Sequence, residues 1–413
     1  MRIAVGIVSL FPGGGLQRDC VEISNMMHHF GHEVVVYTAR LTHAIDNADV
    51  PIVVIPNDAR TNHRRQYRFA VDFARQTSNR FDLIVGFDKL IGLDVLYCAD
   101  RSMRYRLRKQ LHLRLLPRYR VYRDLEGDSF KPRQKTRLIL LSQRQWVEYL
   151  SVWRTERGRI AELPPTLSPA RRKPEYRVDG IRNRTRMQLG LAAKTWVWLS
   201  IGVQPKTKGF DRVVRALHHF PEATLLIAGL DGTEDAAQQT AELAQRLGVS
   251  SRLIWLGHRE DIENIATASD VLMHPARYDT TGTVILEALV NGLPVITTSA
   301  SGYAKHVEAA GGGLVLDEPF DFLSFLTATA EMSDPTRRAT YSQAGIAYGQ
   351  NKGLYEGRML AAQMIINLAV SKRRNVSESD ILWSAPLDGR LRNGDALATQ
   401  QQTCVRRGSG RIT

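Results

Sequence analysis

Two lysines and two acids in the second half of the sequence have the types and spacing needed to hold a phosphorylated sugar. Lys206 and Lys208 follow an expected strand and stand just before Gly209, where their charges could neutralise a diphosphate. Asp279 and Glu287 are separated by seven residues. The two carboxylates could accept hydrogen bonds from the hydroxyls of a sugar and of a ribose.

The residues between these two acids predict a helix that begins near Gly282. The first backbone amides of a helix have no carbonyl partner within it and attract anions. Those of Thr283 and Val284 would then point at the same phosphate-sized space, with Asp279 reaching in from the loop and Glu287 one turn further on.

A glycine triplet near the start of the chain is a second candidate site for an anion. Gly13, Gly14 and Gly15 lie between an apolar run at 2–9 and a helical pattern at 16–30. Glycine permits close approach of the backbone to a ligand. However, neither the GxGxxG spacing nor the lysine of a P-loop is present. The triplet alone therefore fits a tight turn as well as a phosphate site.

The elements that must position these residues alternate between strand and helix along most of the chain, which predicts parallel sheets. Strands are expected in two groups, at 2–9, 33–38, 51–56, 81–86 and 138–142, and at 196–201, 223–229, 253–256, 271–274 and 294–298. The run Leu163, Pro164, Pro165 and Thr166 interrupts the alternation and is typical of a hinge.

The fold class expected is α/β, with two Rossmann-like doubly wound domains and a cleft between the carboxyl edges of their sheets. We assign residues 1–167 to an amino-terminal acceptor-binding domain and 168–350 to a nucleotide-sugar-binding domain. A helix at 351–370 is expected to pack back on the first domain, and 371–413 to form a flexible tail.

Length and composition are those of a soluble two-domain protein. The chain has 413 residues, 43% of them hydrophobic and 24% charged, which excludes a largely disordered or collagen-like chain. Three cysteines are too few for a disulfide framework or a cysteine-rich zinc site. With no apolar run of membrane-spanning length and no signal-peptide pattern, we expect a cytoplasmic protein that does not span the membrane.

Several of these stretches, in order and spacing, resemble the retaining GT-B glycosyltransferases of family 4. They are the stretch from Gly202 to Gly209, the Asp279 and Glu287 pair, and the run GHREDIENIATASDVLMHPARYDTTGTVILEALVNGLPVITT. Within that family, further stretches are similar to the lipopolysaccharide core enzymes that add glucose to heptose: Gly14 to Asp19, Thr61 to His63, Gly92 to Asp94 with Asp100, and Leu163 to Pro165. The resemblance extends to about residue 370.

The resemblance implies a UDP-glucose donor, a lipopolysaccharide core acceptor and transfer with retention. It implies that Lys208 neutralises the diphosphate, that Asp279 binds the donor sugar and that Glu287 binds the ribose, with His258 and Arg259 facing the uracil. The donor set so implied is Gly14, Gly15, Lys206, Lys208, His258, Arg259, Asp279, Gly282, Thr283, Val284 and Glu287, and the acceptor set is Asp19, His63, Lys89 and Asp100. Asp279, Lys208 and Asp19 are the expected catalytic residues.

Three positions depart from the family pattern. The acid at 279 is normally Glu, so Asp279 is one methylene shorter; Thr207 stands where relatives have Arg, and Asp88 where they have Asn. No Asp-x-Asp motif occurs, so no metal is expected and no other cofactor is implied.

The positive charge is concentrated in two segments, and the first of them, the basic segment, holds most of it. The chain carries a net charge of +14, of which residues 101–137 hold +10 and 371–413 hold +4, so the remainder is neutral. Leucines and tyrosines among the arginines predict a face that binds an anionic membrane, and thus a peripheral protein on the inner face of the cell membrane. The residues expected at that surface are Arg104, Arg106, Arg108, Lys109, Arg114, Arg118, Tyr119, Arg120, Tyr122 and Arg123.

Two other interpretations of this segment remain open. It can be a solvated basic face, or a surface for nucleic acid, which we do not expect because no nucleic-acid module surrounds it. For the whole chain, the alternatives are a family 4 enzyme with another nucleotide sugar or another glycolipid or polysaccharide acceptor, and a non-catalytic binding protein on the same scaffold.

Overall fold

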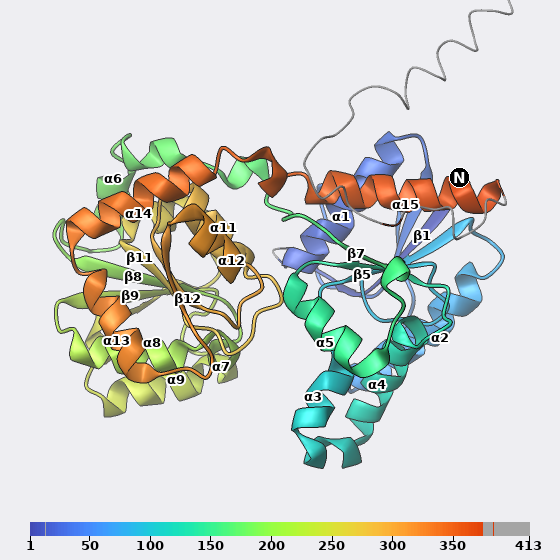
Figure 1. The fold of residues 1–413 in the computed structure, drawn as a ribbon, viewed down its shortest axis with the longest axis horizontal. Helices are drawn as coiled ribbons and strands as arrows, with labels where there is room; N and C mark the ends of the chain where they lie inside the picture. Colours follow the sequence, from blue (N-terminus) through green and yellow to red (C-terminus); the bar gives the residue numbers. More distant parts are fainter. Residues whose placement is uncertain (13, 375–382, 384–413) are drawn as a thin grey trace, which may run out of the picture.

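Two parallel sheets form the centres of two α/β domains in the computed structural model, which describes residues 1–12, 14–374 and 383 (Figure 1). The first sheet has the order β3-β2-β1-β4-β5-β6-β7. Its strands are β1 (Arg2–Leu10), β2 (Glu33–Leu41), β3 (Ile52–Val54), β4 (Leu83–Gly86), β5 (Val95–Cys98), β6 (Arg137–Leu140) and β7 (Ile160–Glu162). The near-continuous apolar run in β1 fits a strand that helices cover on both faces.

The second sheet repeats the same winding with the order β10-β9-β8-β11-β12-β13. Its strands are β8 (Trp196–Ile201), β9 (Ala223–Ala228), β10 (Leu253–Trp255), β11 (Val271–His274), β12 (Val295–Thr298) and β13 (Gly313–Leu316). The two doubly wound sheets predicted from the sequence are thus confirmed. In each, the strand order reverses between the first and fourth strands, β1 and β4 or β8 and β11, where ligands of such sheets bind.

Helices cover both faces of each sheet. Those of the first domain are α1 (Gly15–His29), α2 (Asn62–Thr77), α3 (Met103–Lys109), α4 (Pro117–Phe130) and α5 (Gln143–Trp153), with the 3-10 turn η1 (Leu111–Leu115). Those of the second are α6 (Ile181–Gln188), α7 (Pro205–Lys208), α8 (Phe210–His219), α9 (Asp235–Arg246), α10 (Ile262–Ala268), α11 (Thr283–Val290), α12 (Ala304–Ala310), α13 (Phe322–Glu331) and α14 (Pro335–Tyr348).

The last helix, α15 (Gly357–Arg373), returns to the first domain and lies along α1 (Figure 1). Its Ile365 and Leu368 belong to the same buried cluster as Ile3 and Val5 of β1. The linker pairs with the returning chain, because the Gly357 amide donates to the Pro165 carbonyl at 3.1 Å. Both crossings between the domains therefore run side by side.

The structure corrects the expected start of the tail. The helix continues three residues beyond 370, and Lys372 in this last stretch forms an ion pair with Asp94 of the first domain at 2.6 Å. Trp383 is buried against the first sheet, and its indole nitrogen donates to the Leu138 carbonyl at 3.1 Å. The remainder of the expected tail, 375–382 and 384–413, lies outside the described residues.

The basic segment folds as three short pieces rather than one helix. α3 ends at Lys109, η1 follows, and α4 starts at Pro117, and together they extend away from the sheet (Figure 1). The proline at the first position of α4 explains one break, because it cannot continue a preceding helix. None of the helices that the structure describes has the length and apolarity to cross a bilayer.

Candidate active site

The loops after β8 and β11 approach each other closely, and a glycine makes this possible. Gly209 has φ +78°, a conformation that side chains disfavour. A Cβ atom there would lie 2.1 Å from the Pro275 carbonyl oxygen, so no larger residue fits. The short helix α7 before it carries Lys208, which the tight turn directs toward the end of β11.

Asp279 is the centre of the cluster that results. Its Oδ2 accepts hydrogen bonds from Lys208 Nζ and from His274 Nε2, the latter at 2.9 Å. His274 is fully buried at the end of β11. Burial alone would raise the pKa of Asp279, but the His274 hydrogen bond and the Lys208 charge outweigh it and hold the pKa well below its usual range. Asp279 is therefore a permanent carboxylate at neutral pH.

The first turn of α11 lies against this carboxylate. Gly282 caps the helix with φ +82°, and a Cβ atom on it would lie 3.5 Å from Oδ2 of Asp279. The amides of Thr283 and Val284 are in the first turn, where no carbonyl of the helix reaches them. An ammonium group and a helix amino terminus thus converge on one place, as expected for a site that binds a diphosphate.

Glu287 lies one turn along α11 and faces the first domain. Its Oε1 is 4.0 Å from Nη1 of Arg18, on α1. Burial raises the pKa of Glu287, with Arg171 and Arg18 opposing. Gly14 and Gly15 begin α1 just before this arginine, and no atom lies within 4 Å of a Cβ built on Gly15. Gly14 and Gly15 therefore lie at the end of α1 that approaches α11.

Tyr278 makes a second contact between the domains. Its hydroxyl donates to Glu148 Oε2 at 3.4 Å, and the guanidinium carbons of Arg101 and Arg144 lie 4.1 and 5.0 Å from its ring centroid. These three residues belong to the first domain, whereas Tyr278 directly precedes Asp279. The loop that carries the central carboxylate is consequently held from both sides.

Three other expected donor residues lie apart from this cluster. Lys206 is exposed on α7. His258 and Arg259 follow β10, the outer strand of the second sheet, and Arg259 forms an ion pair with Asp261 at 2.8 Å. They therefore lie at the carboxyl edge of the sheet, as Lys208 and Asp279 do, but within the described residues no contact joins them to these two side chains.

Asp19 does not present a free carboxylate. Its Oδ1 accepts from Arg358 Nε of α15 at 2.7 Å, and its Oδ2 accepts from the Tyr97 hydroxyl at 2.7 Å. The Thr166 hydroxyl of the linker adds a contact at 3.4 Å. The side chain is buried and joins α1, the linker and α15 at the hinge, and a catalytic role for Asp19 stays a prediction.

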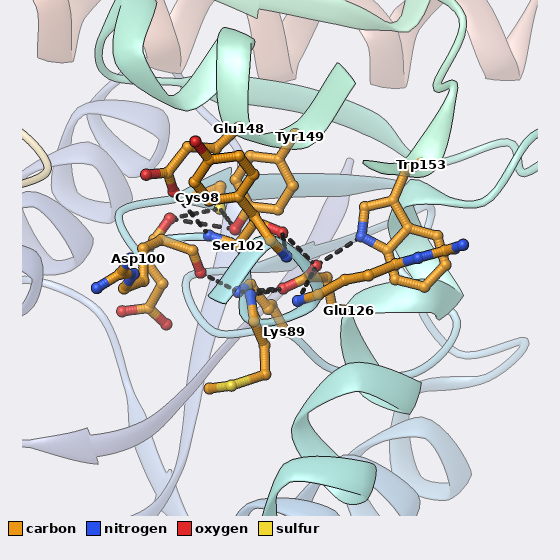
Figure 2. Close-up of polar contacts among 12 residues, drawn as sticks. Lys89, Cys98, Asp100, Ser102, Glu126, Glu148, Tyr149 and Trp153 are labelled. Atoms are coloured by element: carbon orange, nitrogen blue, oxygen red, sulfur yellow. Dashed lines mark hydrogen bonds and ion pairs between the residues drawn. The ribbon is translucent and has the colours of Figure 1, made fainter. Parts of the chain in front are cut away.

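Lys89 is likewise buried and hydrogen-bonded rather than open to solvent. Its Nζ donates to Glu126 Oε2 at 3.0 Å and to the Arg101 carbonyl at 2.9 Å (Figure 2). Burial alone would lower the pKa of Lys89, but Glu126 and other nearby acids outweigh it and raise the pKa above its usual value. Glu126 also accepts from the Ser102 hydroxyl at 2.7 Å and the Met103 amide at 2.6 Å, so the pair fixes the start of α3. A role for Lys89 on the acceptor side stays a prediction.

Asp100 and His63 remain accessible. The Asp100 side chain is exposed and turned away from the Lys89 network (Figure 2). Burial, together with the Asp100 charge, raises the pKa of Asp88 to about 7, so the Asp88 carboxyl lies near that charge at the end of β4. His63 is half-buried on α2 and meets the Tyr122 ring edge-on at 6.5 Å.

Comparisons with known proteins agree with this geometry. A profile of the family described as Glycosyl transferases group 1 matches residues 181–344, which contain Lys208, Asp279 and Glu287. The lipopolysaccharide glucosyltransferase WaaG of Escherichia coli (strain K12) is 31% identical over 375 residues, covering 88% of this chain and 98% of that protein. The chain belongs to the group 1 glycosyltransferases.

Solved structures confirm the GT-B architecture of this glycosyltransferase. A crystal structure of WaaG superposes with a TM-score of 0.80 at 30% identity, covering 88% of this chain and 99% of that one. The structure of the Anabaena protein HepE in complex with UDP-glucose superposes with a TM-score of 0.68 at 19% identity, covering 90% of this chain and 100% of that one. At this identity the similarity concerns the fold alone.

Most of the arginines expected at the surface of the basic segment of the glycosyltransferase are exposed, but Tyr119 is not. Tyr119 is buried with Leu107 and Leu113, which corrects its assignment to a membrane surface. Arg106 and Arg118 lie over its ring, and Arg104 lies over Trp153. Leu111, Leu115 and Leu116 are the apolar side chains left open, at 60%, 76% and 41% exposure. The expected face of leucines and tyrosines is not continuous, because the turn η1 interrupts the helix. Of the other residues expected there, Arg106 and Tyr122 are half-buried, and the Lys109 side chain lies outside what the structure describes. The exposed ones are Arg104, Arg108, Arg114, Arg118, Arg120 and Arg123.

Sequence reasoning missed several residues that the site depends on. His274 stands five positions before Asp279 at a strand end, which was the available signal. Arg18, Tyr278 and Glu126 gave no such signal, because each acts on a partner far away in the sequence. No group of three or more His, Cys, Asp or Glu side chains that could hold a metal occurs among the described residues.

Proposed function

We propose that this glycosyltransferase moves glucose from UDP-glucose to a heptose of the lipopolysaccharide inner core, with retention, at the inner face of the cell membrane. The observation that carries the donor half is the convergence of Lys208, Asp279 and the start of α11 at Gly282. The relationship to WaaG, whose name states lipopolysaccharide and glucose, supports the choice of sugar and acceptor.

Lys208 and the amides at the start of α11 would stabilise the departing diphosphate. The leaving group gains negative charge in the transition state, so preorganised donors lower the barrier more than they tighten binding. An ammonium group has three protons, so Lys208 can hold Asp279 and a phosphate oxygen together. Because these groups supply positive charge at the diphosphate, we propose that transfer requires no metal.

Asp279 would accept hydrogen bonds from hydroxyls of the donor sugar, and Glu287 from those of the ribose. His274 and Lys208 keep Asp279 charged and fix its orientation. The shorter side chain is compatible with this role, because it lies directly against Gly282. On the acceptor side, we propose roles for Asp100 and His63. With Asp19 and Lys89 engaged in structural pairs, we favour attack from the face that the diphosphate leaves over a covalent intermediate.

The decisive experiment is incubation with UDP-glucose and a lipopolysaccharide core truncated at heptose, followed by mass spectrometry. We expect one added hexose, released UDP, and no dependence on added divalent metal or on EDTA. Lys208→Ala should slow product formation by about 10²–10³-fold, whereas exposed Lys135→Ala should leave it unchanged. Transfer only from another UDP or GDP sugar would overturn the choice of glucose.

We further propose that η1 and the arginines around it dock the enzyme on anionic lipid. The three open leucines can enter the interface while Arg108 and Arg120 meet headgroups at about 1 kcal/mol each. Binding to vesicles that contain phosphatidylglycerol should weaken as salt rises and on Leu111→Ser with Leu115→Ser. A non-catalytic role would be favoured if Lys208→Ala kept the cellular function and charge reversal at Arg108 and Arg120 abolished it.

A further inference from the structure

A hollow of about 480 Å³ opens beside the first turns of α2, outside the site described above. Arg60, Arg64 and Arg68 line it, together with Asp58 and Tyr67. Val121 of α4 closes one side, so the hollow lies where α2 packs against the basic segment. Its volume is within the range of small-molecule sites.

The arginines of this hollow are spaced to act together. Arg64 and Arg68 are four residues apart on α2 and share one face of the helix, while Arg60 reaches in from the preceding loop. Arg68 forms an ion pair with Asp58. Among the described residues, no carboxylate lies within ion-pair distance of Arg60 or Arg64. Two guanidinium groups are therefore available to a ligand.

The backbone around Arg60 is held in place before any ligand arrives. Arg65 donates to the Asn62 side chain at 3.0 Å and to the Ala59 carbonyl at 3.1 Å. Asn57 donates to the Arg65 carbonyl at 2.9 Å and accepts from the Ala59 amide at 3.1 Å. This ring of hydrogen bonds ties the loop to the first turn of α2, so little ordering is needed when an anion binds.

We propose that this hollow binds a phosphate monoester group borne by a sugar or a lipid. Three arginines against one aspartate leave a net charge of two positive, which matches a phosphate dianion, and guanidinium forks bind phosphate oxygens in pairs. Tyr67 is half exposed and offers an aromatic face to the group that carries the phosphate.

The position of the hollow favours a phosphate that arrives on a membrane. α4 continues directly from η1, whose Leu111 and Leu115 are the most exposed apolar side chains of the basic segment. A lipid-borne phosphate could therefore reach α2 while the leucines touch the bilayer. The inference concerns anion binding alone and does not depend on the proposed glucose transfer.

The test compares the double variant Arg60→Gln with Arg64→Gln against Arg75→Gln, an exposed arginine at the far end of the same helix. One arm titrates inorganic phosphate by phosphorus NMR, and the other measures binding to vesicles with phosphatidic acid, which has a monoester headgroup. Vesicles of matched surface charge with phosphatidylglycerol, a diester, are the reference. UDP binding by calorimetry and the melting temperature report on the donor site and the fold.

We expect the double variant to weaken binding of phosphatidic acid vesicles at least tenfold and Arg75→Gln to change it less than twofold, with UDP binding and melting unaltered. Loss in the vesicle arm alone would assign the site to lipid phosphate, and loss in both arms to phosphate from either source. The proposal is overturned if the double variant binds like the wild type, or if monoester and diester vesicles bind equally and both arginine changes weaken them alike. A failed glucose transfer with intact phosphate binding would contradict the proposed function only.

Discussion

The two domains share one winding but use their charged residues in opposite ways. At the carboxyl edge of the second sheet, Lys208 and Asp279 converge on the open first turn of a helix. In the first domain, Asp19 and Lys89 are buried and pair with Arg358 and Glu126. A charge near the ligand edge of a sheet is thus evidence for chemistry only when its partners leave hydrogen-bonding capacity unused.

Removing the Lys89 ammonium should give the largest effect. Lys89→Met leaves the carboxylate of Glu126 charged and fully buried without its ion-pair partner. Breaking such a pair costs about 3–5 kcal/mol of unfolding free energy. Urea unfolding measures it. The exposed Lys135→Met should change stability by less than about 0.5 kcal/mol. A stable Lys89→Met enzyme with impaired acceptor binding would restore Lys89 to the acceptor site and break the contrast between the domains.

Lys208→Ala should show the reverse pattern. Loss of one preorganised donor to the leaving group costs ~10²–10³ in rate. The unfolding free energy should fall far less than for Lys89→Met, because Lys208 is partly exposed and Asp279 keeps its bond to His274. Steady-state kinetics and urea unfolding separate the two quantities. Lys206→Ala is the neighbouring control, and an equal loss of rate there would show that the exposed lysine shares the diphosphate.

The sequence predicted what is local and periodic. Both sheets, the helix start at Gly282 and the grouping of Lys208 with Asp279 followed from strand ends and spacing. It did not predict that the Asp19 carboxylate would pair with Arg358, because Arg358 is more than three hundred residues away in the sequence. Nor did it show that η1 would divide the basic segment, since the apolar spacing across Gln110 and Leu116 is still helical.

A double-mutant cycle tests the role of Asp19 at the hinge. Asp19→Asn and Arg358→Gln each remove one member of a buried pair, and the double change removes both. We expect a coupling of about 1–3 kcal/mol in unfolding free energy, with both single variants losing stability. If Asp19 acted as a catalytic base instead, Asp19→Asn would lower the rate far more than Arg358→Gln. The changes in unfolding free energy of the two single variants would then sum to that of the double variant.

The smallest expected effect is a pH dependence that arises at Asp88. Burial and the nearby Asp100 charge raise its pKa from 3.8 to about 7, so the folded state retains a proton that the unfolded state releases. Stability from this group is therefore complete below about pH 4 and is lost as pH rises toward 7. Asp88→Asn keeps an oxygen for the Val8 amide, now 2.6 Å away, but carries no charge. Relative to wild type, the unfolding free energy of the variant should be unchanged at pH 4 and higher by about 1–2 kcal/mol at pH 8. The gain is small because the Asp88 side chain is partly exposed, so solvent screens its charge.

Urea unfolding at pH 4, 6 and 8 measures this difference, with exposed Asp124→Asn as the control that should stay flat. A gain that is the same at every pH would mean that Asp88 is ionised in the folded protein throughout. The acid at the end of β4 would then be a charged group like Asp279, and the first domain would present a reactive carboxylate after all. A gain confined to high pH would instead mark Asp88 as an acid that changes charge near neutral pH, as distinct from Asp279, which stays ionised throughout.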